Sequence, residues 1–232
     1  MVVRQRATHV EDKQERREHL LDACECLLCE NPERVVSVAE VAERAGLAKG
    51  TVYLYFPSKE EMLLALHQRH GEDFFRELIA LLEGPGPVDF DAVMDVARRL
   101  IIELPTYLPL AGLCFGTMEK SLPDDASVEF KARMAELMGR AGAGLERHFP
   151  VLSASDGAAL LTRSYAMIVG LWQMLHPRPG VDEKLAARCG GFFPRDYATE
   201  IESGLRALWL GTQAMSDGAT TSIGAHPKEP TQ

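Results

Sequence analysis

The pattern of apolar and polar positions is clearest in residues 37–59. Ser37 and Glu40 have the spacing of a capping box, in which each side chain accepts a hydrogen bond from a free amide at a helix start. Small apolar residues then recur at helical spacing up to Ala45, and Gly46 follows. Glycine is common just after a helix because the backbone there often needs a positive φ. The pattern predicts a short helix that starts at Ser37 and a sharp turn at Gly46.

A second short helix is predicted over residues 48–56. Val52 and Phe56 lie four positions apart, so they share one face, which we expect to pack on the first helix. Gly50 costs a helix interior about 1 kcal/mol relative to alanine. Its presence favours a close approach by another molecule, such as a DNA backbone.

A long helix is predicted after Pro57. Ser58 and Glu61 repeat the capping-box spacing. We expect the helix to run over residues 59–82, until the Gly-Pro-Gly-Pro sequence at 84–87 ends it.

The chain before residue 37 is expected to contain an arm and a helix. Residues 2–10 are polar and basic, which favours a mobile arm whose Arg4 and Arg6 can reach a DNA minor groove. Leucines and a cysteine at helical spacing predict an amphipathic helix over residues 12–30, which would complete a three-helix head.

The residues between the apolar anchors form a candidate DNA-binding surface. Lysine favours phosphate, threonine can meet a phosphate or a base edge, and tyrosine offers a hydroxyl on a rigid apolar body. No carboxylate occurs in residues 47–59. The predicted DNA-binding residues are Ser37, Lys49, Gly50, Thr51, Tyr53, Tyr55 and Lys59, together with Arg4 and Arg6.

Residues 38–63, VAEVAERAGLAKGTVYLYFPSKEEML, resemble the DNA-binding unit of the TetR family of bacterial transcriptional regulators. A helix-turn-helix followed at once by Tyr-x-Tyr-Phe-Pro-Ser-Lys-Glu is more restrictive than a helix-turn-helix alone. In that family the position of Ala48 is often a serine or threonine that caps the recognition helix and touches phosphate, which alanine cannot do. The resemblance implies a sequence-specific DNA-binding regulator without enzymatic activity or cofactor, a repressor released by a small hydrophobic or amphipathic effector.

The chain beyond residue 87 shows repeated helical periodicity and no alternating strand pattern. The expected helices cover residues 89–103, 108–120, 126–148, 154–175 and 196–211. The sequence therefore predicts an all-α fold, in which the long helix joins a head to a body. The expected domains are a DNA-binding head at 1–60, an effector-binding and dimerisation body at 61–215, and a disordered tail at 216–232.

The last two long helices carry more apolar surface than the body needs. Residues 158–175 are nearly uncharged, so this helix is expected to be buried on all sides, although its polar residues argue against a membrane span. The resemblance implies that the helices 154–175 and 196–211 pair with their copies in a homodimer. A two-fold pair of recognition helices suits a palindromic operator. The pattern assigns no role to the 177–194 connection.

Methionine and aromatic side chains in the body are typical of an adaptable pocket for a hydrophobic molecule, with ordinary core packing as the alternative. Arg163 stands in an apolar helix, so we expect it to pair with a carboxylate such as Glu119 or to meet an anionic ligand. The candidate ligand-binding residues are Tyr107, Phe115, Met118, Met138, Arg163, Tyr165 and Trp172.

The charge balance restricts the DNA prediction to a local surface. The net charge of the 232 residues is −9, and residues 1–60 contain nine basic against eleven acidic residues. This balance argues against a general polyanion binder. A sequence-specific binder needs positive charge only where phosphates lie.

The cysteines indicate a reduced compartment. Their number, five, forms no even disulfide framework, and the N-terminus has no apolar signal core, so a cytoplasmic protein is expected. Cys24, Cys26 and Cys29 cannot all converge on one metal ion from a regular helix, and we expect them to fill the core.

Two alternatives come from other classes of protein. Gly112-Leu113-Cys114-Phe115-Gly116 matches the nucleophile elbow of a hydrolase with Cys114 as nucleophile, although that elbow requires a preceding strand. His67 and His70 lie three positions apart on the long helix, which allows a metal-responsive regulator if a third ligand exists.

Overall fold

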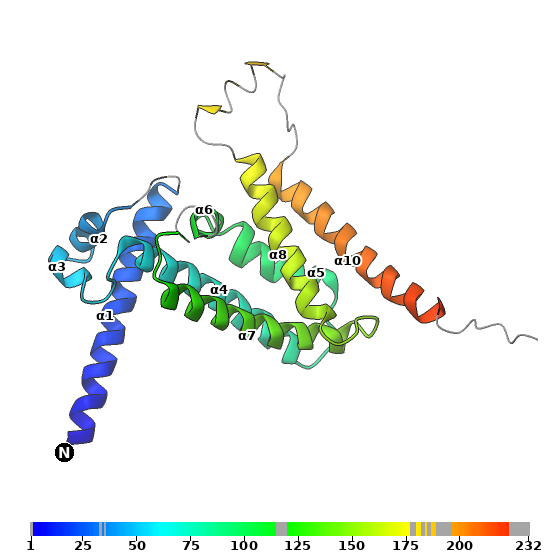
Figure 1. Ribbon diagram of the computed structural model, residues 1–232, viewed down its shortest axis with the longest axis horizontal. Helices are drawn as coiled ribbons and strands as arrows, with labels where there is room; N and C mark the ends of the chain where they lie inside the picture. Colours follow the sequence, from blue (N-terminus) through cyan, green and yellow to red (C-terminus); the bar gives the residue numbers. More distant parts are fainter. Residues whose placement is uncertain are drawn as a thin grey trace, which may run out of the picture. The chain divides into compact units, whose positions relative to one another are not determined.

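The computed structural model describes residues 2–32, 34, 36–114, 120–176, 180–181, 184, 187–188 and 196–222, with side chains from residue 12 to residue 214 of this set. The helices are α1 (Val2–Glu30), α2 (Val38–Arg44), α3 (Lys49–Val52), α4 (Lys59–Glu83), α5 (Phe90–Ala97), the π-helix η1 (Arg98–Ile102), α6 (Tyr107–Leu113), α7 (Asp124–His148), α8 (Asp156–Leu175) and α10 (Tyr197–Ser222) (Figure 1). Over the described residues the chain has no strand, and the predicted all-α fold is confirmed.

The chain forms two compact units. Unit 1 contains Met1–Asp73 and Leu100–Met134, and unit 2 contains Phe74–Arg99 and Ala135–Gln232. The helices α4, η1 and α7 therefore contribute residues to both units.

The start of α2 has the hydrogen bonds that the sequence predicts. The Ser37 hydroxyl accepts from the Glu40 amide at 3.3 Å, and the Glu40 carboxylate accepts from the Ser37 amide at 3.0 Å. Gly46 follows the helix with φ of 66°, in the left-handed region that favours glycine. The capping box and the glycine turn are confirmed.

The second predicted helix is shorter than expected. α3 covers only Lys49–Val52, and a turn replaces helix over residues 53–55. Its N-cap residue, Ala48, makes no side-chain hydrogen bond, so the helix starts without the support that serine or threonine gives. Val52 and Phe56 are both buried, as predicted, and they hold α3 and the turn on the head core.

α1 differs from the sequence expectation at two places. Its backbone is helical from Val2, because no proline or glycine interrupts residues 2–30, so the expected helix start at residue 12 is corrected. The DNA-reaching role of residues 2–10 stays a prediction. Cys24 is buried, but Cys26 and Cys29 are exposed. Cys26 lies about 200° around the helix from Cys24, so all three cysteines cannot fill one core.

α4 begins as predicted after Ser58, whose hydroxyl accepts from the Glu61 amide at 3.1 Å. The helix then runs without a break to Glu83, close to the predicted end at residue 82. Within unit 1, Arg69 of α4 contacts α1 carboxylates at Glu18 (3.4 Å), Asp22 (2.6 Å) and Glu25 (2.6 Å). We call these four residues, together with His70, the α1–α4 cluster.

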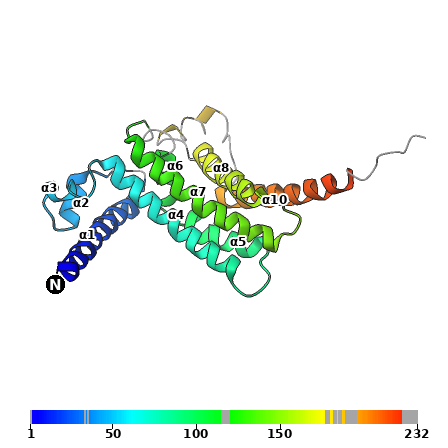
Figure 2. The same cartoon turned by 60° about the horizontal axis from the view of Figure 1, so that its bottom comes forward.

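In unit 2, α8 packs against α10, and in Figure 2 α8 overlaps the first part of α10. Trp209 of α10 is buried, and its indole N–H donates to the Ser164 hydroxyl of α8 at 3.0 Å. α7 and α8 approach so closely that a Cβ on Gly142 would lie 2.8 Å from the Cα of Ala158. Glycine is required there because no other residue leaves room for the facing backbone.

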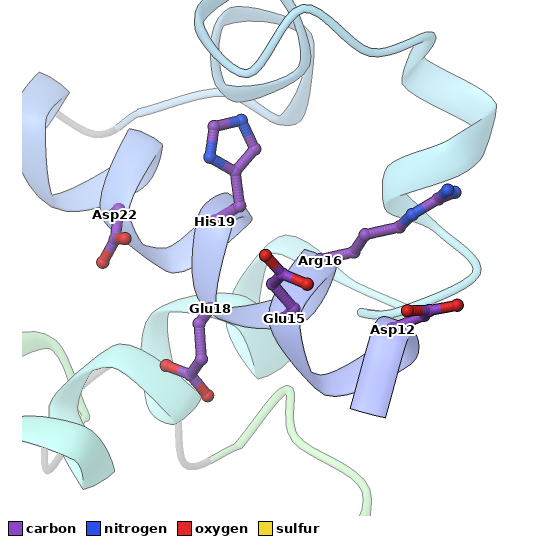
Figure 3. Close-up of a pocket in the computed structure, with 6 residues that line it drawn as sticks. All are labelled: Asp12, Glu15, Arg16, Glu18, His19 and Asp22. Atoms are coloured by element: carbon purple, nitrogen blue, oxygen red, sulfur yellow. The ribbon is translucent and has the colours of Figure 1, made fainter. Parts of the chain in front are cut away.

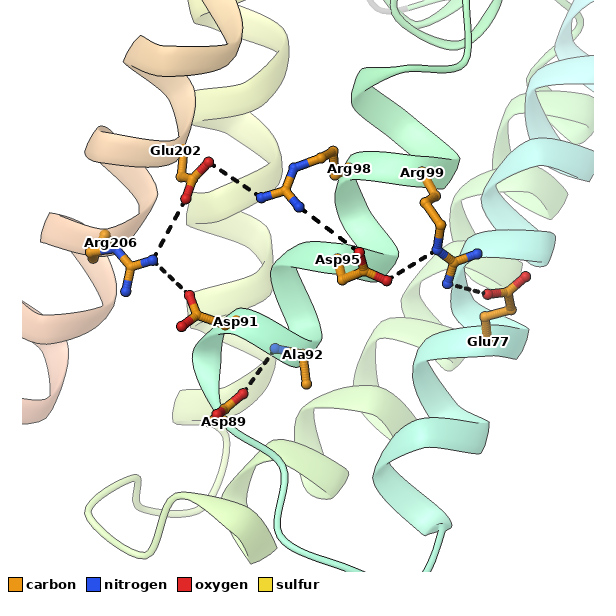
Figure 4. Close-up of polar contacts among 9 residues, drawn as sticks. All are labelled: Glu77, Asp89, Asp91, Ala92, Asp95, Arg98, Arg99, Glu202 and Arg206. Carbon is orange, nitrogen blue, oxygen red and sulfur yellow. Dashed lines mark hydrogen bonds and ion pairs between the residues drawn. The ribbon is translucent and has the colours of Figure 1, made fainter.

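Ion pairs on the surface of unit 2 connect α4, α5, η1 and α10 (Figure 4). Arg99 bridges Glu77 at 2.8 Å and Asp95 at 3.1 Å. Arg206 contacts Asp91 at 2.6 Å and Glu202 at 3.6 Å, and Glu202 also accepts from Arg98 at 3.3 Å. These groups are largely exposed, so each pair contributes little to stability on its own.

α8 keeps exposed apolar surface within the single chain, since Met174 is 60 % exposed and several other residues of the helix face solvent. Its expected burial on all sides depends on the homodimer and stays a prediction. One expectation about unit 2 is corrected. α10 runs to Ser222, so residues 216–222 are helical rather than part of a disordered tail, since no proline occurs in residues 195–226. No helix among the described residues is long and apolar enough to cross a bilayer.

Candidate nucleic-acid interface

The candidate surface is built from α2, the Gly46 turn, α3 and the turn that leads to Pro57. Val52 and Phe56 anchor it, and the side chains of the two residues that follow Val52 are exposed. Lys49 and Gly50 are exposed, Tyr53 is 44 % exposed, and Thr51 is half-buried. Four predicted DNA-binding residues therefore share one carboxylate-free segment of the surface.

Open space surrounds Gly50. A Cβ built at this position would meet nothing within 4 Å, so packing inside the chain does not require glycine there. This observation is compatible with the prediction that another molecule approaches Gly50.

The other predicted DNA-binding residues are partly buried, already paired, or outside the residues whose side chains are described. Tyr55 is half-buried and packs against the head core. The Ser37 hydroxyl is engaged with Glu40, and Lys59 is half-buried with its ammonium group 3.4 Å from the Glu60 carboxylate. The side chains of Arg4 and Arg6 lie outside the described residues.

Side chains of α1 contact the residues that support this surface. The Arg17 guanidinium lies 5.1 Å from the ring centroid of Phe56, and Arg44 of α2 pairs with Glu30 of α1 at 2.7 Å. His19 of α1 makes a further contact of 3.2 Å with the Ala45 carbonyl oxygen. The candidate surface is thus held by one buried cluster and by polar contacts at its edge.

Comparison with known proteins identifies the family. The sequence profile described as bacterial regulatory proteins of the tetR family matches residues 20–66, and the profile of the tetracyclin repressor-like C-terminal domain matches residues 68–216. The second match alone covers more than half of the chain. The chain belongs to the TetR family. Because this is a family of regulatory proteins, the assignment favours a regulator over the cysteine hydrolase.

Curated relatives of this TetR-family chain match over its N-terminal part. The HTH-type transcriptional regulator EthR of Mycobacterium tuberculosis is 36 % identical over 84 residues, which are 36 % of this chain and 39 % of EthR. The HTH-type transcriptional repressor KstR of Rhodococcus jostii is 42 % identical over 60 residues, 26 % of this chain and 28 % of KstR. Each match thus spans well under half of the relative.

A solved structure has a similar fold over most of the chain. A putative TetR-family regulator from Mesorhizobium loti superposes with a TM-score of 0.54 and 19 % identity, over 88 % of this chain and 97 % of that one. At this identity the likeness supports the fold alone.

The candidate ligand residues of the TetR-family body fall in both units. Tyr107 is buried in unit 1, whereas Met138, Arg163, Tyr165 and Trp172 belong to unit 2. Phe115, Met118 and Glu119 lie outside the described residues. Arg163 is exposed on α8 within the single chain, and its pairing with Glu119 or with an anionic ligand stays a prediction.

Three of these residues have identified neighbours. The Thr162 hydroxyl lies 3.0 Å from the Met138 sulfur. The ring of Trp172 stacks on His176 with centroids 4.9 Å apart. Tyr107 meets the ring of His67 edge-on at 5.1 Å.

The two histidines of the metal alternative are buried among aromatic rings. Burial, with a smaller contribution from His70, lowers the pKa of His67 to about 3, so His67 is neutral at physiological pH. His70 instead contacts the Glu25 carboxylate at 2.8 Å. Among the residues whose placement is described, no group of three or more His, Cys, Asp or Glu side chains could hold a metal ion.

Cys114 lacks the setting of a hydrolase nucleophile. It is buried at the end of α6, after a helix rather than a strand. Burial raises the pKa of Cys114 to about 12, which opposes thiolate formation.

A hollow on α1 was not anticipated from the sequence. Figure 3 shows its lining by Asp12, Glu15, Arg16, Glu18, His19 and Asp22. Four carboxylates and one guanidinium make it unsuited to DNA phosphate or to an apolar effector.

Proposed function

We propose that this protein is a sequence-specific DNA-binding transcriptional regulator that contacts DNA through α2, α3 and the turn at residues 53–55. The observation that carries the proposal is the carboxylate-free segment 47–59, which bears Lys49, Thr51 and Tyr53 and is held in place by buried anchors. The names of EthR and KstR, which match over this part of the chain, support it. Such a role implies a cytoplasmic location, where bacterial DNA is found.

Lys49→Ala and Tyr53→Ala are each expected to weaken binding to an operator duplex. Loss of the Lys49 charge should reduce the slope of log affinity against log salt concentration by about 0.9 for each bound copy, almost independently of operator sequence. Tyr53→Ala removes no charge, so it should weaken binding without changing the slope. Fluorescence anisotropy at several salt concentrations measures both effects, on an operator selected from random duplexes with the wild-type protein.

Lys120→Ala is the matched control, because Lys120 is exposed but lies outside the candidate surface. It should leave affinity and salt slope unchanged. Wild-type affinity and slope in both Lys49→Ala and Tyr53→Ala would reject the proposed DNA surface.

The protein is further proposed to act as a homodimer through α8 and α10. Both helices expose apolar side chains, with Met174 and Leu210 each 60 % exposed. Burial of such side chains in a symmetric interface would place two recognition surfaces on one palindromic operator. Sedimentation equilibrium should give twice the chain mass of 25.6 kDa for the wild type, and a smaller mass for Leu210→Glu. A monomeric wild type would contradict the dimer.

The regulator is also proposed to be a repressor released by a small hydrophobic or amphipathic effector. The uninterrupted α4 and the methionine and aromatic side chains of the body support this. The effector would favour a state in which α4 holds the two recognition surfaces at the wrong separation. Ligands that raise the melting temperature without altering operator affinity would argue against this mechanism.

A further inference from the structure

The turn after α3 exposes a large apolar side chain that the sequence interpretation did not assign. Leu54 is 75 % exposed, more than any other large apolar residue whose side chain is described. It lies beside Tyr53 and within the same carboxylate-free segment as Lys49. Single exposed leucines are common on protein surfaces, so exposure alone carries no function. The position of Leu54 inside the candidate DNA surface gives it significance.

The backbone fixes the direction of Leu54. Val52 and Phe56 are buried on either side, two positions away, so the residue between them turns outward. The Leu54 amide donates to the Thr51 carbonyl at 3.1 Å, and the Phe56 amide donates to the Val52 carbonyl at 3.0 Å. The side chain is therefore presented by an ordered turn, which lowers the entropy cost of a contact with a partner.

The chemistry of leucine restricts what it can contact on DNA. Its side chain has no hydrogen-bond donor or acceptor, so it gains nothing from a phosphate or from the polar atoms of a base edge. In the major groove the C5-methyl group of thymine is the apolar feature that distinguishes one base from another. We propose that Leu54 determines specificity by packing on the C5-methyl group of one thymine in each operator half-site. This inference rests on the proposed DNA-binding function and adds the class of sequence that is preferred.

Replacement of thymine by deoxyuridine, which removes only the methyl group, tests the proposal. The probe is a duplex selected from random DNA with the wild-type protein, in which each thymine is replaced by deoxyuridine in turn. For the wild type we expect one position per half-site where the replacement weakens binding about fourfold, the effect of one buried methyl group. Leu54→Ala should bind the thymine and deoxyuridine duplexes equally at that position. Leu54→Met, which keeps an apolar side chain, should retain the preference.

Val128→Ala removes another exposed apolar side chain, 65 % exposed on α7, and should leave the methyl preference of the wild type intact. A deoxyuridine effect that persists in Leu54→Ala, or no deoxyuridine effect in the wild type, would overturn the role of Leu54. If Lys49→Ala and Tyr53→Ala nevertheless weaken binding, the proposed DNA function still stands. Failure to select any duplex would overturn both proposals.

Discussion

Gly142→Ala is expected to lower the free energy of unfolding of unit 2 by about 3 kcal/mol, the upper range for overpacking. A Cβ at this position would lie 2.8 Å from the Ala158 Cα and 2.9 Å from its Cβ. The obstacle is mainly backbone, which cannot rotate away as a flexible side chain can. The α7 and α8 segments around this contact would have to move apart, and apolar contacts between them would be lost.

Gly139→Ala provides the control from the same helix. A Cβ there meets nothing within 4 Å, and the residue is exposed. Alanine should therefore stabilise α7 by about 0.5–1 kcal/mol, because glycine loses more backbone entropy on folding. Trp172 and Trp209 both belong to unit 2, so tryptophan fluorescence during urea unfolding follows this unit. Equal stabilities for the two variants would show that α7 and α8 do not approach closely at Gly142.

Arg69→Met is expected to destabilise unit 1 by about 2 kcal/mol. The substitution leaves the Glu18, Asp22 and Glu25 carboxylates of α1 without the cation that they share. Breaking a buried ion pair costs about 3–5 kcal/mol, and the figure is lower here because the side chains of Asp22 and Glu18 are 65 % and 39 % exposed. Hydrogen exchange of the α1 amides within residues 12–30 measures this decrease in the stability of unit 1.

The loss of stability caused by Arg69→Met should depend on pH. The hydrogen bond with His70 is the main cause that holds the pKa of Glu25 below its ordinary value, and Arg69 lowers it further. A carboxylate with a lowered pKa stabilises the fold above the ordinary glutamate pKa of about 4.3, and this contribution is lost as pH falls through the lowered pKa. The difference between wild type and Arg69→Met should therefore be full near pH 7 and shrink in acid.

Arg140→Met is the matched control for Arg69→Met. Arg140 makes two hydrogen bonds to the Glu83 carboxylate, at 2.9 and 2.7 Å, but the pair is exposed. Solvent and salt screen such a pair, so its loss should leave the unfolding transition unchanged. A similar effect of both substitutions would show that the α1–α4 cluster is no stronger than a surface ion pair.

The features that the sequence predicts well are those fixed by short-range contacts. The capping box at Ser37 and Glu40, the positive φ of Gly46 and the start of α4 after Ser58 each depend on residues within a few positions. The buried positions of Val52 and Phe56 follow from helical spacing. For this reason the local architecture of the DNA-binding head can be inferred from its amino-acid sequence.

Features that depend on tertiary packing were not predictable in the same way. The exposure of Cys26, Cys29 and Arg163 depends on which helix face meets another helix. The need for glycine at Gly142 depends on Ala158, which lies on the next helix and gives no signal in the local pattern. The exposure of Leu54 could have been predicted from the sequence, because Leu54 lies two positions from each of the buried anchors Val52 and Phe56.

The buried anchors and the exposed residues of this short segment have separate roles, and this separation affects how the protein can evolve. Val52 and Phe56 maintain the fold of the head, whereas Lys49, Tyr53 and Leu54 contribute little to its core. Substitutions at the exposed positions can alter operator preference while the folding energy stays nearly constant. After gene duplication, one copy can therefore acquire a new operator by a few substitutions within residues 49–54. Each intermediate variant along that path still folds.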